Sequence, residues 1–245
     1  IDLSVGSIYA LASVLGALAF RHFGPDGASP DTAPWLAVSL GALACVGSAT
    51  ACGLVNGSLI VALRVHPFII TLGAMAILRG IAFVVTKGQS VGGFPPLFRE
   101  MIRWETSGGL SLVPLGVMLV VLAVGWIYLS RLAAGRRVYA VGGNELASRF
   151  SGIRVDRVKI GVYLLSGFAA GIAALIALGY YGSASSGDGQ GYELNVIAAA
   201  VVGGASLTGG RGSALGAVLG ALIIQMIASR SEERRVGKEC RLTCR

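Results

Sequence analysis

The chain has 245 residues, of which 54% are hydrophobic and only 13% are charged, and its mean hydropathy is +0.75. A soluble domain carries about 25% charged residues, so this composition excludes an ordinary soluble domain and is typical of an integral membrane protein. The net charge of +8 does not indicate nucleic-acid binding, because the basic residues gather in one loop and a terminal tail without interleaved aromatic residues.

Long runs without Asp, Glu, Lys or Arg support the membrane assignment. They cover residues 32–63, 106–130, 160–187, 194–210 and 212–229. A helix needs roughly 20 apolar residues to cross the hydrocarbon core of a bilayer. The 37 glycines suit helices whose backbones approach closely inside a membrane.

In chain order, we expect membrane segments over 3–20, 35–63, 68–86, 110–129 and 160–181. The second segment is longer than one straight crossing requires, and its glycines and Asn56 indicate a tilt or a break. Because the chain opens inside an apolar segment without an initiator Met, we expect it to be a fragment with sequence missing upstream.

The last apolar region, 194–228, is interrupted by Gly203-Gly204 and by Gly209-Gly210-Arg211-Gly212. Each piece is too short for a full crossing. Two half-length helices around a glycine break are expected where the backbone lines a cavity rather than lipid. These glycines are therefore candidates for a gate or a cavity wall, with close helix packing as the alternative.

The loop 131–159 holds seven basic and two acidic residues between two apolar runs. The positive excess predicts that this loop lies in the cytoplasm. Alternation along the chain then predicts that 21–34, 87–109 and 182–193 lie outside, which agrees with their low or acidic charge.

A short helix is predicted inside that loop. Gly142 and Gly143 turn the chain, Asn144 is a suitable N-cap, and Glu145 in the first turn suits the helix dipole. Gly152 ends the helix. One face carries Leu146, Ala147, Phe150 and Ser151. From the residues alone, the loop is either a contact for a soluble partner or a solvated connector.

Few polar residues interrupt the apolar segments. Asp2 either caps the first helix or has a function at membrane depth. Arg79 lines a transport path, pairs with another helix, or lies near a helix end with its charge in the interface. Asn56 binds a solute hydroxyl or joins helices by hydrogen bonds. His66 precedes Pro67 at a turn, which favours helix entry over proton relay.

The four cysteines and the C-terminal tail do not indicate a metal site. Cys45 and Cys52 lie in an apolar helix as small packing residues, and Cys240 and Cys244 have no nearby His, which argues against zinc. Residues 230–245 hold six basic and three acidic residues without apolar helical periodicity. We expect this tail to be a non-native addition and exclude it from the fold.

Four stretches together resemble a known family. They are IDLSVGS (1–7), HPFIITLGAMAILRGIAFVVTKGQ (66–89), GRRVYAVGGNELASRFSGIRVDRVKIGVY (135–163) and GYELNVIAAAVVGGASLTGGRGSALGAVLGALI (191–223). The chain is similar, from residue 1 to about 228, to the permease subunits of bacterial ABC importers for simple sugars such as ribose, xylose and galactose. Members of that family have further helices on both sides of this stretch.

This resemblance implies an all-α, polytopic bundle with broken helices, like that of type II ABC importers, in the bacterial plasma membrane. It implies one transmembrane domain over 1–229, a second permease copy, a cytoplasmic ABC ATPase subunit and a periplasmic sugar-binding protein, with lipid around the bundle and no nucleic acid. No G-x-x-x-x-G-K-[ST] loop is present to hold phosphates, so no cofactor is expected and ATP is bound by the partner subunit.

The resemblance also turns the loop 131–159 into the expected contact with the ATPase. The coupling residues would be Gly142, Gly143, Asn144, Glu145, Ala147, Phe150, Ser151 and Gly152. The candidate path or gate residues are Asn56, Arg79, Gly203, Gly204, Gly209 and Gly210.

Other functions stay open. A related permease for branched-chain amino acids, nucleosides or a signalling sugar would share this architecture. An ion-coupled secondary transporter would need intramembrane acids, which 68–181 lack within its apolar segments. A membrane enzyme would need a catalytic cluster, whereas the only histidines are His22 and His66.

Overall fold

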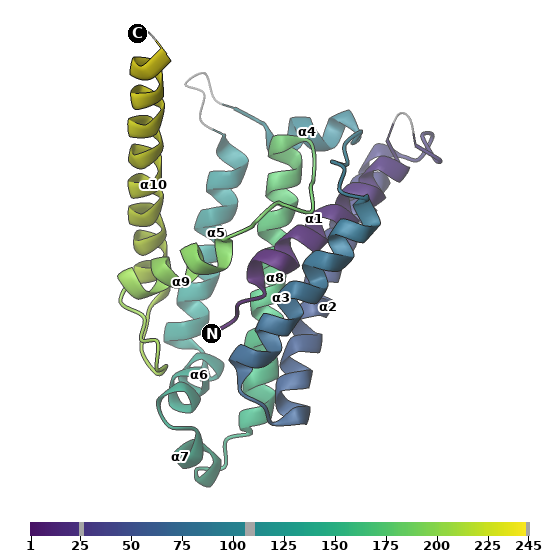
Figure 1. Ribbon diagram of the computed structural model, residues 1–245. Coiled ribbons are helices and arrows are strands. Elements are labelled where there is room, and N and C mark those ends of the chain that lie inside the picture. The colour runs from purple at the N-terminus through teal and green to yellow at the C-terminus, as the bar shows by residue number, and fades with distance from the viewer. Residues whose placement is uncertain (25–26, 106–110, 244–245) are drawn as a thin grey trace. The chain divides into compact units, whose positions relative to one another are not determined.

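The computed structural model describes residues 1–24, 27–105 and 111–243, with side chains placed as far as Arg230. Over these residues the regular structure is helical, apart from isolated β-bridges that pair Val91 with Ala184 and Glu105 with Ser111 (Figure 1). The predicted all-α class is therefore confirmed.

Five helices are long and apolar enough to cross a membrane. They are α1 (Val5–His22), α2 (Pro34–Leu63), α3 (Pro67–Thr86), α5 (Leu112–Arg131) and α8 (Val155–Tyr181). Each overlaps one of the five predicted segments. Pro34 and Pro67 stand in the first turns of α2 and α3, where a missing N–H costs nothing and the fixed φ favours the helix.

Of the two alternatives predicted for the second segment, a tilt or a break, the break is wrong, because α2 is one continuous helix of 30 residues. At 1.5 Å per residue such a helix is about 45 Å long, whereas the hydrocarbon core is about 30 Å thick. The tilt remains as one way to accommodate the excess length.

The chain divides into two compact units. Unit 1 comprises Ile1–Val121 and Arg154–Glu193, and unit 2 comprises Leu122–Ile153 and Leu194–Arg245. The expected single domain over 1–229 stays a prediction.

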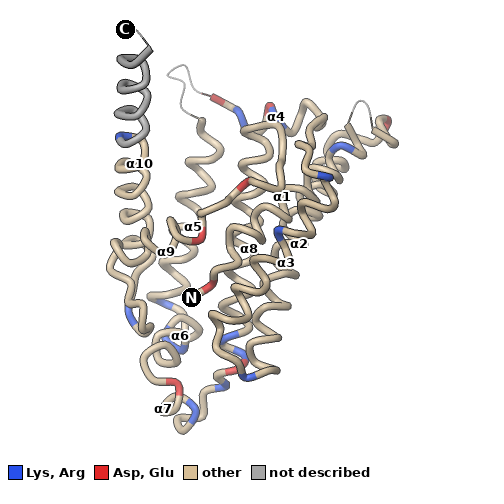
Figure 2. The backbone as a smooth tube through the Cα atoms, in the orientation of Figure 1, with Lys and Arg blue, Asp and Glu red and all other residues tan. Residues whose placement is uncertain are grey.

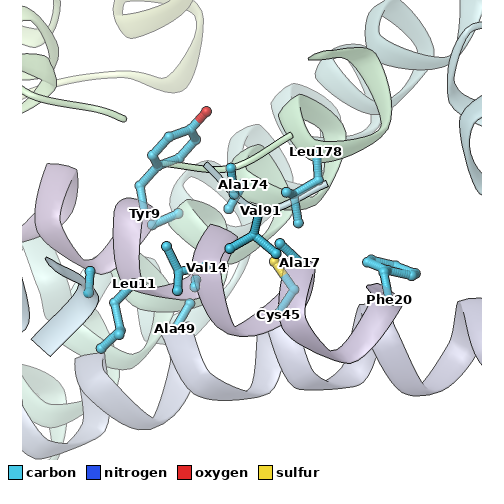
Figure 3. Close-up of a cluster of buried hydrophobic side chains, with 14 of the residues drawn as sticks. Tyr9, Leu11, Val14, Ala17, Phe20, Cys45, Ala49, Val91, Ala174 and Leu178 are labelled. Atoms are coloured by element: carbon cyan, nitrogen blue, oxygen red, sulfur yellow. The ribbon is translucent and has the colours of Figure 1, made fainter. Parts of the chain in front are cut away.

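In unit 1, α1 is the central helix and packs against α2, α3 and α8. Its Ile8, Val14 and Phe20 side chains are fully buried, and they meet residues from α2 and α8 in the hydrophobic cluster drawn in Figure 3. Helices α2 and α8 run antiparallel with backbones in near contact, since a Cβ on Gly53 would collide with the carbonyl oxygen of Tyr163. Small residues thus bring these helices together, as is usual in membranes.

The three segments predicted to lie outside meet at one end of unit 1. Val91 and Ala184 exchange backbone hydrogen bonds of 2.8 and 2.9 Å, and the Nε of Arg103 donates to the carbonyl of Tyr180 at 2.7 Å. A short helix, α4 (Pro96–Ile102), was not predicted and closes this end by stacking Phe98 on Phe20. Their common location fits the predicted alternation of the segments, and the side of the membrane that this end faces stays a prediction.

Unit 2 contains α6 (Ala133–Gly143), α7 (Glu145–Phe150), most of α9 (Tyr192–Val202) and α10 (Ala214–Thr243). The two half-length pieces predicted for 194–228 are observed as α9 and the apolar start of α10. Helix α10 also continues through the proposed tail, where the sequence indicated no helical periodicity. The side chain of Cys240, and Cys244 and Arg245 altogether, lie outside the described residues.

Candidate functional site

Helix α7 has the local geometry that the sequence predicted. The Oδ1 of Asn144 accepts a hydrogen bond from the backbone N–H of Ala147 at 2.9 Å, which is an N-cap. At the other end Gly152 has a φ of +80°. The N–H groups of Gly152 and Ile153 bond back to Arg149 and Ser148, which forms a Schellman motif. The short helix is therefore closed at both ends by its own sequence.

The predicted apolar face of α7 is open to solvent. Phe150 is 85% exposed and Leu146 is 64% exposed, and Ala147 and Ser151 are also exposed. The buried residue of this helix is Ser148, which the sequence did not single out. Two large apolar side chains on a helix of six residues form a small hydrophobic surface that the described residues of unit 2 leave uncovered.

Helix α6, which directly precedes α7, was missed by sequence analysis. The signal was present in Ala134, Val138 and Val141, which are four and three residues apart, the spacing of one helix face. Gly142 and Gly143 were taken as a turn, but both belong to the last turn of α6.

The structure brings together two sets of glycines that were predicted separately. A Cβ on Gly142 would lie 2.6 Å from the backbone nitrogen of Gly210, and a Cβ on Gly209 would lie 2.6 Å from the carbonyl oxygen of Gly142. The hydroxyl of Tyr139, on α6, donates to the carbonyl oxygen of Gly212 at 2.7 Å. The end of α6 thus lies backbone to backbone against the loop between α9 and α10.

That loop is the turn of a tight helical hairpin. Gly204, Gly209 and Gly210 have φ values of +88°, +93° and +74°, a region that residues with a Cβ rarely adopt. A Cβ on Gly203 would collide with the carbonyl oxygen of Gly216, and one on Gly220 with that of Ala199. Helices α9 and α10 are therefore in backbone contact, and α9, with 11 residues, is about 16 Å long, roughly half the thickness of the hydrocarbon core.

This arrangement can transmit a displacement. Helix α7 is joined to α6 by Asn144 alone, and α6 touches the hairpin loop through main-chain atoms and one short hydrogen bond. Because no long side chain separates the two backbones, little movement can be absorbed between them. A push on α7 would move the hairpin loop.

Basic residues mark the same segment. Figure 2 shows Lys and Arg concentrated on α6, α7 and the chain leading into α8. Arg149 forms an ion pair with Glu145 at 3.2 Å, one turn apart on α7. Both side chains are about half exposed, so this pair adds little stability.

Asn56 and Asp2 belong to a polar network in unit 1. The amide of Asn56 donates to the Oγ of Ser4 at 2.8 Å, and this hydroxyl donates to Oδ1 of Asp2 at 2.6 Å. The other oxygen, Oδ2, accepts from Ser166 at 3.1 Å. The network joins α2, the start of α1 and the middle of α8, which supports the helix-joining role of Asn56. Oδ1 of Asp2 also accepts from the N–H of Ser4, as in a local cap.

Arg79, also in unit 1, reaches a loop rather than an acidic side chain. Its Nη1 donates to the carbonyl oxygens of Ser186 and Asp188 at 3.0 and 3.4 Å. The other terminal nitrogen, Nη2, is buried and has no hydrogen-bond partner among the described residues. Arg79 therefore holds the segment 182–193, which is predicted to lie outside, against α3, a contact that sequence analysis did not find.

Comparisons with known proteins identify transport permeases as relatives of this chain. A family model described as branched-chain amino acid transport system, permease component, matches residues 1–232. The chain is 40% identical over 227 residues to the ribose import permease protein of Escherichia coli K12, covering 91% of this chain and 67% of that protein.

Other relatives have similar sequence identity and coverage. The ribose import permease protein of Bacillus subtilis 168 is 40% identical over 225 residues, with 91% and 66% of the two chains covered. The D-allose transport system permease protein of Escherichia coli K12 is 37% identical over 227 residues, with 93% and 66% covered. The chain thus spans about two thirds of the length of these relatives. No solved structure matches it.

Proposed function

The chain belongs to the family of branched-chain amino acid transport system permease components, and from this premise we propose that it carries a monosaccharide across the bacterial inner membrane as the permease of an ABC importer. The observation that carries the choice of solute is the 40% identity, over 91% of the chain, to a ribose import permease. A cytoplasmic ATPase subunit supplies the energy, and a periplasmic binding protein delivers the sugar.

The exposed face of α7 is the ATPase contact in this proposal. Leu146 and Phe150 present apolar surface within the segment 131–159, which carries the excess of Lys and Arg and is therefore cytoplasmic by the positive-inside rule. Such side chains are the usual anchors of a helix in a partner's groove. Asn144 and Gly152 set the position of this face through the two ends of α7.

The hairpin loop is the gate in this proposal. When the ATPase moves α7, the end of α6 displaces Gly209 and Gly210 through their contact with Gly142. The rigid pairing of α9 with α10 through Gly203 then carries the movement along the hairpin. Rocking of rigid helices around a fixed path is how alternating access works in transporters built from broken helices.

A second permease copy completes the path in this proposal. The family resemblance supports this pairing, and the molar mass of the detergent-solubilised complex tests it. Two permease chains per two ATPase chains are expected, whereas a complex with one permease chain would contradict the pairing.

A different solute is the second candidate, because the family description names branched-chain amino acids. An uptake assay distinguishes the two. The full-length permease is reconstituted into vesicles with its ATPase and binding protein, and uptake of radiolabelled D-ribose, D-allose and L-leucine is measured with ATP or with a non-hydrolysable analogue inside.

We expect uptake of a sugar that requires ATP hydrolysis. Uptake of leucine alone would replace the sugar by an amino acid as the substrate. If a proton or sodium gradient drives uptake without ATP, the importer assignment itself is wrong and the protein is an ion-coupled transporter.

A further inference from the structure

A cavity of about 340 Å³ lies at the outer end of unit 1. It is bounded by α1, the C-terminal end of α8, the loop between α8 and α9, the first residue of α9, and Ser90. We call it the outer cavity, and its principal lining residues are Tyr9, Ser13, Tyr181, Ser185, Asp188 and Tyr192. Small-molecule sites have volumes of about 300 to 1,000 Å³, so this cavity suits a ligand of monosaccharide size.

The wall of the outer cavity combines aromatic rings with hydroxyl groups. Tyr9 and Tyr192 stand with ring centroids 5.5 Å apart and planes tilted by 53°. Figure 3 shows the hydroxyl of Tyr9 directed away from the neighbouring hydrophobic side chains. The faces of such rings carry partial negative charge and attract the C–H groups of a sugar ring, while hydroxyls donate and accept hydrogen bonds.

One hydroxyl in this wall lacks a partner. Ser13 is 2% exposed, and its Oγ is buried without a hydrogen bond among the described residues. The great majority of buried polar atoms are hydrogen-bonded, so an unpaired one calls for a reason. Rotation of this side chain about χ1 would turn the hydroxyl into the cavity, where a hydroxyl of a bound ligand would supply the missing partner.

The charge of the wall disfavours an anionic group on the ligand. Asp188 is the one charged residue among the described lining residues, and its Oδ2 accepts from the N–H of Ser185 at 2.8 Å. No Lys or Arg is among those residues, so the carboxylate of an amino acid would find no counter-ion there. A polyol needs none, because its hydroxyls bind to carboxylate and hydroxyl oxygens alike.

The loop that forms one side of the cavity is held in place. Arg79 binds the carbonyls of Ser186 and Asp188, and Ala184 is paired with Val91. Because the loop is already ordered before the ligand binds, binding carries only a small free-energy cost for ordering the site.

We propose that the outer cavity is a binding site for a monosaccharide on the outer side of the permease, where the sugar first contacts the membrane subunit. This rests on the proposed function, since it requires the transported solute to be a sugar. The binding is weak compared with that of a dedicated binding protein, because a transport site must also release its ligand.

The test is direct binding of D-ribose, D-allose and L-leucine to the full-length permease–ATPase complex in lipid nanodiscs, without the binding protein, measured by saturation-transfer NMR. Ser13→Ala removes the unpaired hydroxyl and Tyr192→Phe removes only the phenolic oxygen. Ser39→Ala is the matched control, because Ser39 lies exposed on α2 and its hydroxyl donates to the carbonyl of Trp35 one turn earlier in the same helix. Size-exclusion chromatography establishes that each variant assembles.

We expect a sugar to bind to the wild-type complex, and Ser13→Ala to raise its Kd about 2- to 13-fold, the range for one neutral hydrogen bond, with Ser39→Ala unchanged. Equal affinities for wild type and both wall variants, or preferential binding of leucine, would overturn the site. ATP-driven sugar uptake in the same variants separates the two ideas. If the variants show normal uptake and unchanged binding, the proposed binding site is wrong but the importer assignment stands. If the wild type takes up sugar without ATP, the importer assignment is wrong.

Discussion

Replacing Gly142 by alanine tests the contact between α6 and the hairpin loop. The added Cβ would lie 2.6 Å from the nitrogen and 3.3 Å from the Cα of Gly210, whereas ordinary contacts begin at 3.4 Å. Because the obstructing atoms are main-chain atoms of a glycine at φ +74°, they cannot rotate aside, and α6 or the loop must shift. Overpacking of this kind costs about 1–3 kcal/mol.

Gly143→Ala is the matched control. It adds the same methyl group to the next residue of the same helix, where no atom lies within 4 Å of the new Cβ. The change from glycine to alanine in a helix favours folding by up to about 1 kcal/mol. The two variants therefore have opposite expected effects on stability, although their composition is identical.

The assay is the ratio of sugar molecules transported to ATP molecules hydrolysed in reconstituted vesicles, with thermal unfolding of each variant in parallel. A shift of 1–3 kcal/mol in the balance between gate conformations changes populations about 5- to 150-fold. We expect Gly142→Ala to lower this ratio at least about 5-fold while ATP hydrolysis continues, and Gly143→Ala to keep it. If both variants transport equally well, the contact does not carry the coupling.

Two further predictions concern unit 1. Arg79→Gln removes a cationic donor from the carbonyls of Ser186 and Asp188, and each of these bonds contributes about 1.5–3 kcal/mol. We therefore expect faster amide hydrogen exchange in 182–192, whereas Arg64→Gln, at the exposed end of α2, should leave the exchange rate unchanged. Unaltered exchange in Arg79→Gln would show that other contacts hold the loop. A double-mutant cycle of Asn56→Ala and Ser4→Ala, followed by thermal unfolding, should give a coupling free energy of about 0.6 to 1.7 kcal/mol, the range for interhelical hydrogen bonds in membranes. Additive effects of the two substitutions would mean that the 2.8 Å hydrogen bond between these residues contributes nothing to stability.

The membrane helices were predictable because lipid leaves a strong signal in sequence. A crossing helix needs a long apolar run. Four of the five long helices lie over an uncharged run, and the fifth, α3, is apolar apart from Arg79. The ends of α7 were equally readable, since Asn144 and Gly152 act on their own immediate neighbours. Local chemistry of this kind does not depend on the rest of the fold.

The contacts that matter for the proposed mechanism were not predictable. Gly142 meets Gly210 through main-chain atoms, which carry no side-chain pattern, and Tyr139 bonds to a carbonyl 73 residues away. The outer cavity likewise joins α1 to a loop about 180 residues later. The glycines that interrupt the apolar region 194–228 predicted a turn, but they did not predict that this turn lies against α6.

The break in α2, one of the two alternatives predicted for it, was wrong for a related reason. Its glycines were interpreted as weak points in the helix, whereas Gly53 and Gly57 are buried where α2 packs against α8. Inside a membrane a glycine can serve close packing as well as a break. Only the position of the neighbouring helix decides between these uses.

The central claim is that α7 is the contact with the ATPase. The most direct test places a photo-reactive phenylalanine analogue at Phe150, which is 85% exposed, in the full-length permease co-expressed with its ATPase. The same analogue at Trp104, which is 66% exposed and lies in the loop predicted to be outside, is the control. We predict a permease–ATPase adduct from position 150 and none from position 104. No adduct from position 150, or an adduct from position 104 alone, would contradict the claim.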